Sequence, residues 1–341
     1  MAIDGRSDIY EILDDRFLIP ANGDLRLELL YDGTRWSEGP LYVPAWRQLI
    51  FSDVPNDRLL RWDEATGTVG VFRTAAGHPN GNTLDREGRL ITCEQGNRRL
   101  TRTEHDGSRT VIADRYAGKR FNSPNDVIVR SDGSIWFSDP IFGILSDYEG
   151  NRGESEIGAS NIYRVDPATG KVRIMADGFL TPNGLTFSPD ERRLFVADTV
   201  GGHIKVYDIR DDGTLGPGTV FAQAPANVAQ FDSVRFDDEG RLWAAAGGGG
   251  LHCYAPDGTL IGRIILPLTA SNVTFGGPKN NRLFITAGYH VYSLVVAATG
   301  APRIRGCGPT RPHAAATGAP AQNLDAYATR WRLSARRPQQ G

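Results

Sequence analysis

Short runs of apolar residues alternate with turn-forming residues along most of the chain. Residues 49–53 (LIFSD), 135–139 (IWFSD) and 194–198 (LFVAD) show the pattern, in which an apolar run ends in an acidic side chain and a turn follows. Runs this short, bounded by Gly, Asp, Asn and Pro, are typical of β-strands. Helical periodicity is scarce, and only residues 7–16 are expected to form a helix. The pattern therefore predicts an all-β protein.

The strands recur as a unit of about 40 to 50 residues. Each unit opens with an oxygen-bearing side chain that runs into a strand, and a second strand and then a third follow it. The opening residues lie 39 to 58 positions apart and are Glu38, Asn80, Asn125, Asn183, Asp232 and Ser271. Four short strands in a repeat of this length are the signature of a β-propeller blade. Six units predict a six-bladed β-propeller.

The chain ends are expected to flank one propeller domain over residues 17–296. Residues 24–33 (DLRLELLYDG) alternate as a strand does, so we expect them to pair with the last blade and close the ring without a bare sheet edge. Residues 1–16 are expected as an N-terminal extension. Residues 297–341, rich in Ala, Gly, Pro and Arg, are expected as a largely disordered tail. Residues 143–160 lengthen the third unit and are explained equally well as a solvated loop or as a lid.

The six opening side chains are expected to converge at one mouth of the central channel. Equivalent positions in the blades of a propeller lie on a circle about its axis, so residues that open the innermost strands would form a ring. A single Asn or Asp before a strand is usually explained by local turn chemistry, in which the side chain bonds to its own backbone. Oxygen-bearing side chains at all six positions favour a binding site instead.

The residue types of this ring suit a hard divalent cation. Calcium takes 6–8 oxygen ligands, and the carboxylates of Glu38 and Asp232 would balance its charge. Zinc in a tetrahedral site would favour His or Cys, which the ring lacks. The sequence therefore predicts one divalent ion, with Ca²⁺ as the first candidate and Zn²⁺, Mn²⁺ and Mg²⁺ as alternatives.

A second set of acidic residues ends the second strand of four units. Solvation of a strand end and support for the ring are both open explanations for this set, which consists of Asp53, Glu94, Asp139 and Asp198.

Composition and charge exclude several classes of partner. The formal net charge of −2 gives no reason to expect nucleic acid or an acidic membrane as a partner. No stretch has the roughly 18 consecutive apolar residues of a membrane-spanning helix, and the N-terminus lacks a signal-peptide pattern, so we expect a soluble cytoplasmic protein. The three cysteines are far apart in the sequence and are expected to be isolated buried thiols.

Five segments of the chain resemble the gluconolactonase and regucalcin-like (senescence marker protein) family of six-bladed propellers, and its bacterial lactonases in particular. The resemblance covers roughly residues 16–296. The segments are RWSEGPLY (35–42), NGNTLDREGRLITCEQGNRRL (80–100), RFNSPNDVIVRSDGSIWFSDP (120–140), TPNGLTFSPDERRLFVAD (181–198) and FDSVRFDDEGRLWAAA (231–246).

The resemblance implies a divalent metal ion, commonly calcium, and a set of site residues. The implied metal ligands are Glu38, Asn125, Asn183 and Asp232, which also belong to the ring found from the repeat. Asp232 matches the position often proposed as a general base. The candidates for substrate binding are Asn80, Arg120 and Asn122. The chain departs from bacterial relatives at Gln95, where they often have His, and this weakens any role for an imidazole there.

These observations predict a metal-dependent hydrolase that opens a sugar lactone, glucono-1,5-lactone or a related compound, to the aldonic acid. Asp232 would orient or deprotonate the attacking water. A carboxylate bound to a cation has a depressed pKa and is a poor base, so both roles stay open. The alternatives are hydrolysis of an organophosphate or another ester at the same site, and a calcium-binding propeller without catalysis.

Overall fold

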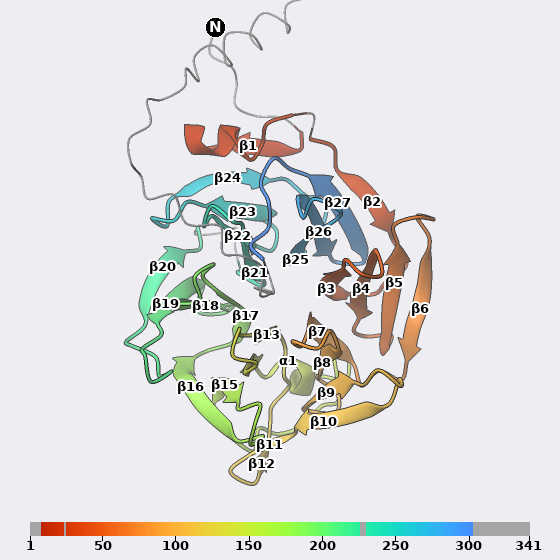
Figure 1. Cartoon of the computed structure of the whole chain (residues 1–341), viewed down its shortest axis with the longest axis vertical. Helices are drawn as coiled ribbons and strands as arrows, with labels where there is room; N and C mark the ends of the chain where they lie inside the picture. The colour runs from red at the N-terminus through yellow and green to blue at the C-terminus, as the bar shows by residue number, and fades with distance from the viewer. Residues whose placement is uncertain (1–7, 24, 226–229, 303–341) are drawn as a thin grey trace, which may run out of the picture. The chain divides into compact units, whose positions relative to one another are not determined.

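The computed structural model describes residues 8–23, 25–225 and 230–302, which are nearly all β. Six antiparallel sheets stand around a central axis, one for each repeat of the sequence (Figure 1). The predicted six-bladed β-propeller is confirmed. Within the described residues, no helix is long and apolar enough to cross a membrane.

The first three blades follow the chain from their inner to their outer strand. Blade 1 consists of β3 (Ser37–Val43), β4 (Gln48–Asp53), β5 (Arg58–Asp63) and β6 (Val69–Thr74). Blade 2 consists of β7 (Pro79–Leu84), β8 (Leu90–Glu94), β9 (Arg99–Thr103) and β10 (Arg109–Ala113). Blade 3 consists of β13 (Val127–Val129), β14 (Ile135–Asp139), β15 (Ser160–Val165) and β16 (Val172–Phe179). A small hairpin of β11 (Arg115–Tyr116) and β12 (Lys119–Arg120) precedes blade 3, and the short helix α1 (Phe142–Leu145) follows β14.

The last two blades take an additional strand from the N-terminal segment. Blade 4 consists of β17 (Pro182–Phe187), β18 (Arg193–Asp198), β19 (His203–Asp208) and β20 (Thr219–Gln223). Blade 5 consists of β21 (Val234–Phe236), β22 (Leu242–Ala245), β23 (Leu251–Tyr254), β24 (Leu260–Ile264) and β1 (Tyr10–Ile12). Blade 6 consists of β25 (Ala270–Gly276), β26 (Arg282–Ala287), β27 (His290–Val295) and β2 (Glu28–Tyr31).

Burial explains why the second strand of each blade was easy to find in the sequence. Every residue of β14 is buried, as is every residue of β4 after Gln48, because other blades cover both faces of these strands. A strand buried on both faces is apolar at successive positions instead of alternating. The outermost strand β6 has no buried residue, and its sequence pattern is correspondingly weak.

The hydrophobic core lies between the blades. Within the described residues, one apolar cluster fills each junction between neighbouring blades. Between blades 2 and 3, the rings of Phe121, Phe137 and Tyr163 pack with centroids 5.1 to 5.3 Å apart. Each blade therefore depends on both neighbours, and the inner strands are held in fixed positions around the channel.

The N-terminal strand closes the ring as predicted. Strand β2 pairs antiparallel with β27, with Glu28 opposite Ser293 and Leu29 opposite Tyr292. Arg282 on β26 bonds to the Glu28 carboxylate at 2.6 Å. Blade 6 thus combines strands from both ends of the propeller sequence, which lie side by side in Figure 1.

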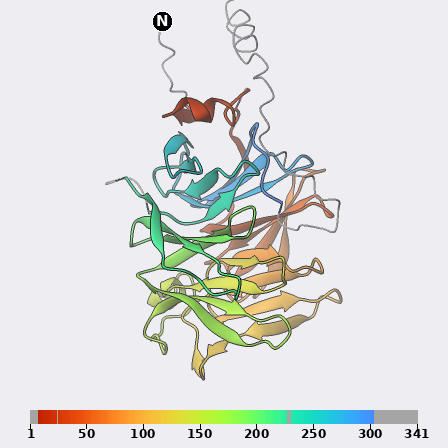
Figure 2. The ribbon, with the colours of Figure 1, turned by 60° about the vertical axis from the view of Figure 1, so that its left-hand side comes forward.

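The helix predicted at residues 7–16 is wrong for the described part of that range. Residues 10–12 form β1, which pairs with the outer edge of β24, and a 3₁₀-helix follows at Asp15–Leu18. Apolar residues at positions 9, 12, 13 and 17 have helical spacing, but β24 offers an open row of backbone partners that an extended segment can use. Both views show this segment beside blade 5 (Figures 1 and 2).

The 3₁₀-helix inserts a side chain into the core. Phe17 is fully buried and lies 6.1 Å from the Trp243 ring. Gly262 leaves room for it, since a Cβ atom there would lie 2.3 Å from the Phe17 ring.

The described part of the expected tail, residues 297–302, packs on blades 5 and 6. The amide of Ala297 donates to the Pro20 carbonyl at 3.1 Å, and that of Gly300 donates to the Asn280 carbonyl at 2.7 Å. Ala301 bonds in the same way to Phe236 at 3.0 Å. Residues 303–341, the rest of the expected tail, lie outside the described residues.

Two of the three cysteines lie in the described residues and are buried free thiols, as predicted. Burial raises the pKa of Cys93 and Cys253 well above the ordinary thiol value. Cys307 lies outside the described residues.

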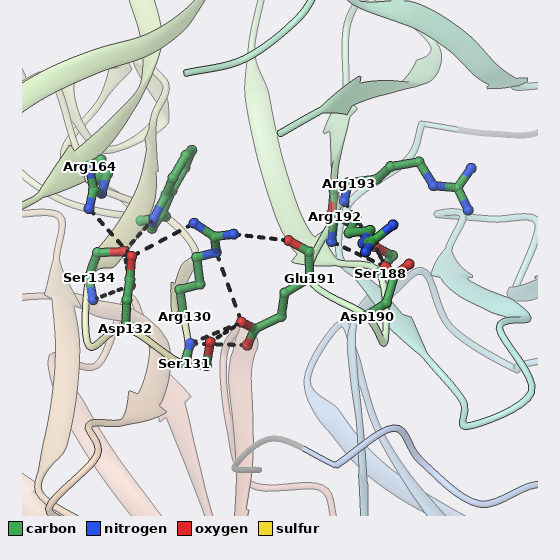
Figure 3. Close-up of polar contacts among 11 residues, drawn as sticks. Arg130, Ser131, Asp132, Ser134, Arg164, Ser188, Asp190, Glu191, Arg192 and Arg193 are labelled. Atoms are coloured by element: carbon green, nitrogen blue, oxygen red, sulfur yellow. Dashed lines mark hydrogen bonds and ion pairs between the residues drawn. The ribbon is translucent and has the colours of Figure 1, made fainter. Parts of the chain in front are cut away.

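A polar network joins the turns of blades 3 and 4 at the ends of the inner strands away from the predicted ring (Figure 3). Glu191, in the β17–β18 turn, accepts hydrogen bonds from the backbone and hydroxyl of Ser131 in the β13–β14 turn. Arg130 adds an ion pair to Glu191 at 3.9 Å. The network fixes these two blades to each other at the opposite end of the channel.

Candidate functional site at the channel mouth

Neighbouring inner strands approach each other closely where the predicted ring begins. The amide of Gly81 donates to the Asn125 carbonyl at 2.7 Å, and the amide of Gly184 donates to the Asp232 carbonyl at 2.9 Å. A Cβ atom on either glycine would lie 2.5 Å from the carbonyl oxygen that it faces, so a larger residue would displace the neighbouring strand. The two Asn-Gly pairs therefore bring the opening residues of successive blades side by side.

The inner strands are also irregular at this point. The register shifts beside the ring positions in β3, β7, β17 and β25, between Glu38 and Leu41 in the first of them. Such bulges redirect side chains and are common next to active sites. At these positions the strict alternation of side chains along the inner strand is interrupted.

The ring residues are largely withdrawn from solvent. Glu38, Asn80, Asn125 and Asn183 are only 2% to 4% exposed, while Asp232 keeps part of its surface accessible. Among the described residues, the side-chain oxygens of Asn80 and Asn183 have no hydrogen-bond partner. Buried polar atoms in folded proteins are nearly always paired. The two unpaired oxygens are therefore available to a ligand.

Glu38 is held from two sides. Trp36 Nε1 donates to one carboxylate oxygen at 3.3 Å, and Asn272 Nδ2 donates to the other at 3.1 Å. We expected Ser271 to be the sixth member of the ring, but its hydroxyl instead donates to the Ser37 carbonyl at 2.8 Å. The sixth blade therefore contributes Asn272 to the site, and Ser271 joins blade 6 to blade 1.

Burial and like charge raise the pKa values of the ring carboxylates. Burial is the largest cause for Glu38, and Glu149 adds repulsion that the hydrogen bond from Asn272 opposes. Burial also raises the pKa of Asp232 well above its usual range, and repulsion from Glu38 and Glu149 raises it further. Three carboxylates thus repel one another in one poorly solvated space, and a bound cation would relieve this repulsion.

The sequence alone did not single out Glu149. It lies in the insertion of the third unit, has no equivalent in the other five repeats, and is half-buried in the structure. Burial raises its own pKa as well. Because the search relied on repetition, a residue carried by a single insertion gave no signal.

The acidic residues at the ends of the second strands hold the segments that enter the ring. The Asp139 carboxylate accepts hydrogen bonds from the backbone amides of Asn122 and Ser123, each at 2.9 Å. The Asp198 carboxylate accepts from the amides of Leu180 and Thr181, also at 2.9 Å. These amides lie two and three residues before Asn125 and Asn183.

The same arrangement recurs in blade 1, where Asp53 accepts from the amide of Arg35 at 2.9 Å. Glu94 differs, because its partners are side chains of its own blade, including Arg99 at 2.7 Å and Thr101 at 2.8 Å. All four acidic residues are buried, so solvation of the strand ends does not explain them. In three blades the second-strand acid positions the backbone that leads to the ring.

The three candidates for substrate binding lie in different environments. Asn80 belongs to the ring and offers an unpaired oxygen. Arg120, on β12, donates to the Asn97 carbonyl at 3.3 Å, and its backbone amide donates to Glu156. Asn122 is fully buried, donates to the Asp139 and Ala159 carbonyls, and accepts from Ser155 at 2.6 Å.

These bonds give Asn122 a structural role, because they use both amide hydrogens and the amide oxygen. Substrate contact by Arg120 and Asn122 stays a prediction.

Gln95 is a further polar residue of this region, fully buried beside α1, and neither end of its amide has a partner within the described residues.

A buried ion pair crosses between non-adjacent blades next to the ring. Arg235, on β21 of blade 5, donates to both carboxylate oxygens of Asp126 in blade 3, at 3.0 and 3.2 Å. Asp126 is fully buried, and its charge contributes to the raised pKa of Asp232. The pair neutralises one acidic residue at the site, while Glu38, Asp232 and Glu149 have no cationic partner within the described part of the chain.

Comparison with known proteins places the chain in a family. Residues 36–289 match the model of the SMP-30/Gluconolactonase/LRE-like region. The gluconolactonase of Zymomonas mobilis is 32% identical over 296 residues, which cover 78% of this chain and 80% of that protein. The chain belongs to the SMP-30/gluconolactonase family.

Solved structures agree with this membership. XC5397 of Xanthomonas campestris, a gluconolactonase, superposes with a TM-score of 0.80 at 41% identity and covers 85% of this chain and 95% of its own. A calcium-binding regucalcin of Agrobacterium tumefaciens superposes with a TM-score of 0.69 over 82% of this chain and 96% of its own. At 21% identity, the regucalcin comparison shows the fold alone.

For this member of the family, the residues of the ring fit a divalent cation. The donors are two carboxylates, Glu38 and Asp232, and two amides, Asn125 and Asn183, and one of the amide oxygens is buried and unpaired. Hard oxygen donors of this kind suit Ca²⁺. Within the described residues, no group of three or more His, Cys, Asp and Glu side chains is arranged to hold a metal ion. The candidate set does not require such a group, since half of its donors are asparagines.

Proposed function

We propose that the protein hydrolyses a sugar lactone, glucono-1,5-lactone or a close relative, to the aldonic acid with the help of one divalent ion, calcium being the first candidate. The proposal rests on the lactonases that share its family and on one observation in particular. The buried, unpaired oxygens of Asn80 and Asn183 stand beside carboxylates whose pKa values are raised by burial and mutual repulsion. This combination favours a cation together with a polyhydroxylated ligand.

The proposed reaction adds water to the carbonyl carbon of the lactone and breaks the bond to the ring oxygen. The product carries a new hydroxyl and a carboxylic acid, which releases one proton at neutral pH. Glu38, Asn125, Asn183 and Asp232 would hold the ion, and when bound it would polarise the lactone carbonyl. Asp232, the one ring residue that is partly accessible, would orient the attacking water. The oxygen of Asn80 would accept a hydrogen bond from a substrate hydroxyl.

Acid production tests the proposal directly. Protein stripped with a chelator is mixed with glucono-1,5-lactone before and after calcium is added, and spontaneous hydrolysis is subtracted. The expected result is proton release that calcium restores, with zinc, manganese and magnesium compared in parallel.

The outcomes separate the candidate functions. Activity that does not respond to stripping and restoration would contradict the metal dependence while keeping the lactonase. No acid production with any of the four ions would contradict the sugar-lactonase proposal. The same ion series with an organophosphate triester would then distinguish another hydrolase from a binding propeller.

A further inference from the structure

Thr199 directly follows the acidic residue that ends the second strand of blade 4. In the four blades whose second strand ends in such an acid, the next residue is Val54, Gln95, Pro140 or Thr199. Thr199 is the only one of these four with a hydroxyl group, so the repeat itself does not require a hydroxyl at this position. The bonds that this hydroxyl makes are therefore particular to blade 4.

The hydroxyl group of the half-buried Thr199 bonds to two neighbouring blades. It donates to the Phe231 carbonyl, in the segment that leads into blade 5, at 2.8 Å. It accepts from Nδ2 of Asn183, on the inner strand of blade 4, at 3.0 Å. One hydroxyl group thus connects the side chain of one candidate ion ligand with the backbone directly before another, Asp232.

The Phe231 carbonyl fixes the direction of these hydrogen bonds. A carbonyl oxygen can only accept, so the hydroxyl must donate its hydrogen to Phe231 and can offer only a lone pair to Asn183. The Asn183 amide then turns its nitrogen toward Thr199 and its oxygen away from it. That oxygen is buried and has no partner among the described residues. The oxygen is therefore free because the nitrogen of the same amide is bound.

The backbone around this hydroxyl is held in place. The Thr199 amide donates to the Thr181 carbonyl at 3.1 Å, and the Val200 amide donates to the Thr181 hydroxyl at 2.9 Å. The side chain of Phe231 is fully buried, which fixes the other end of the connection. Thr199 therefore holds Asn183 from a fixed position.

Asn183 has a second hydrogen-bond partner, the side chain of Asp232. An ionised carboxylate only accepts, so this bond favours the same orientation of the amide. Asp232 is itself a candidate ligand of the ion, whereas Thr199 is not. Thr199 is thus the partner of Asn183 that lies outside the candidate ligand set.

We infer that Thr199 is a positioning residue for the ion site, whose hydroxyl group keeps the amide oxygen of Asn183 available to the ion. The inference rests on the ion site of the proposed function and adds to it a residue that acts through Asn183. Residues that hydrogen-bond to a metal ligand orient it, and the loss of such a residue weakens metal binding about 10- to 100-fold.

The test compares three single variants. Thr199→Val removes the hydroxyl at nearly the same size, and Thr199→Ser keeps it. Thr92→Val is the matched control, because the buried Thr92 hydroxyl, on the second strand of blade 2, donates to Oδ1 of Asn82 at 2.9 Å. Both valine variants lose a bond between a threonine and an asparagine, but Asn82 is not a candidate ion ligand.

Calorimetry with calcium chloride and chelator-stripped protein measures the effect without lactone. Thr199→Val should bind calcium about 10- to 100-fold more weakly than the unmodified protein, and Thr199→Ser and Thr92→Val should stay within about threefold of it. Both valine variants should unfold at a lower temperature, since each leaves a buried polar group unpaired. Unchanged calcium binding by Thr199→Val, or an equal loss in Thr92→Val, would overturn the inference.

A second background tests whether the orientation of the amide is the cause. Asn183→Asp replaces the amide with a carboxylate, which presents an oxygen whichever way it is turned. In this background, Thr199→Val should change the calcium affinity less than about threefold. A loss as large as in the unmodified background would mean that Thr199 acts through the shape of the channel mouth, and this result also overturns the inference.

Lactone hydrolysis, measured in parallel, separates this inference from the proposed function. Calcium binding that depends on the Thr199 hydroxyl, without hydrolysis of glucono-1,5-lactone, would contradict the lactonase and support the inference. Hydrolysis with calcium binding that does not depend on Thr199 would contradict the inference alone. If the unmodified protein binds none of calcium, zinc, manganese and magnesium, both the ion site and the inference fail.

Discussion

Asp232 is the residue at which the ion site and the reaction meet. It is repelled by Glu38 and Glu149, and it is the partly accessible member of the ring. For Asp232→Asn, we expect kcat/KM for glucono-1,5-lactone to fall about 10² to 10⁴-fold, because a group that directs the attacking water is lost. In the absence of calcium, the variant should unfold at a higher temperature than the unmodified protein at pH 8, since one of the repelling charges is gone. Steady-state rates and thermal unfolding with and without calcium measure both effects.

A control for this variant is Asp211→Asn, which changes an exposed residue without a partner among the described residues. It should leave both activity and unfolding unchanged. A drop in the unfolding temperature of Asp232→Asn without calcium would contradict the electrostatic argument, because it would mean that the carboxylate stabilises the ion-free fold.

Single residues of the site could be predicted only where the repeat was regular. Asn80, Asn125 and Asn183 occupy equivalent positions and were found from the sequence. Blades 2 and 4 also have a register shift, between Pro79 and Asn82 and between Pro182 and Leu185. In blade 6 the shift lies between Ala270 and Asn272, one residue closer together, and Asn272 contacts Glu38 while Ser271 does not. A shift of one residue changes the face of a strand on which a side chain lies, and the sequence pattern does not show where a bulge falls.

At the scale of elements, the acidic residue that ends the second strand of a blade accepts hydrogen bonds from the backbone that precedes the first strand. This contact has a measurable consequence in blade 3. Asp139 is fully buried, and burial raises its pKa to about 7, against the hydrogen bonds from Asn122 and Ser123. The folded protein therefore binds a proton that the unfolded chain releases near pH 4. Below about pH 4 the group is protonated in both states and does not change the free energy of unfolding. As the pH rises from about 4 to about 7, the unfolded chain releases the proton and the folded protein keeps it, so the free energy of unfolding falls.

Asp139→Asn removes this titration. The variant should be less stable than the unmodified protein at pH 5, because its amide nitrogen faces one of the two backbone donors. Between pH 5 and pH 8 the difference in the free energy of unfolding between the variant and the unmodified protein should shrink by about 1 to 3 kcal/mol. Urea unfolding at several pH values measures the difference. A disadvantage that grows with pH would show that the hydrogen bonds to Asp139 outweigh the effect of burial.

The elements themselves were predictable to different degrees. The second strands were found because β14 and its equivalents are buried on both faces, so their sequences are continuously apolar. β1 was missed because three residues that pair with β24 carry no pattern of their own. The insertion between residues 143 and 153 was recognised as an interruption, but its bonds to blades 1 and 2 depend on tertiary contacts that local sequence does not encode.

At the scale of the whole molecule, the ring arrangement was predictable because it follows from counting repeats. Six units, together with an N-terminal strand that completes blade 6, leave one way to close the propeller. Contacts that cross the ring between non-adjacent blades do not follow from the repeat. The bond of Arg235 to Asp126 is such a contact, since it joins blade 5 to blade 3 without passing through blade 4.

This ion pair should contribute to the stability of the whole ring. Asp126 is fully buried and the Arg235 side chain is 16% exposed. Arg235→Met would leave a buried carboxylate without its partner, and breaking a buried pair in this way costs about 3 to 5 kcal/mol. Asp126→Asn in the same protein should recover much of that loss, because no buried charge then remains. Urea unfolding of the unmodified protein, both single variants and the double variant gives the coupling between the two residues.

The interaction free energy from this double-mutant cycle decides whether the Arg235–Asp126 pair stabilises the contact between blades 3 and 5. A coupling above about 2 kcal/mol would mean that blades 3 and 5 are held together through the channel, beyond what their packing on blade 4 provides. Additive losses, with a coupling below about 0.5 kcal/mol, would contradict this role and assign the loss in Arg235→Met to its bonds with the Leu185 and Val234 carbonyls.

Because Asp126 also repels Asp232, the Arg235→Met protein should bind calcium at least as tightly as the unmodified protein despite its lower stability. Weaker calcium binding would instead show that the pair positions the ring.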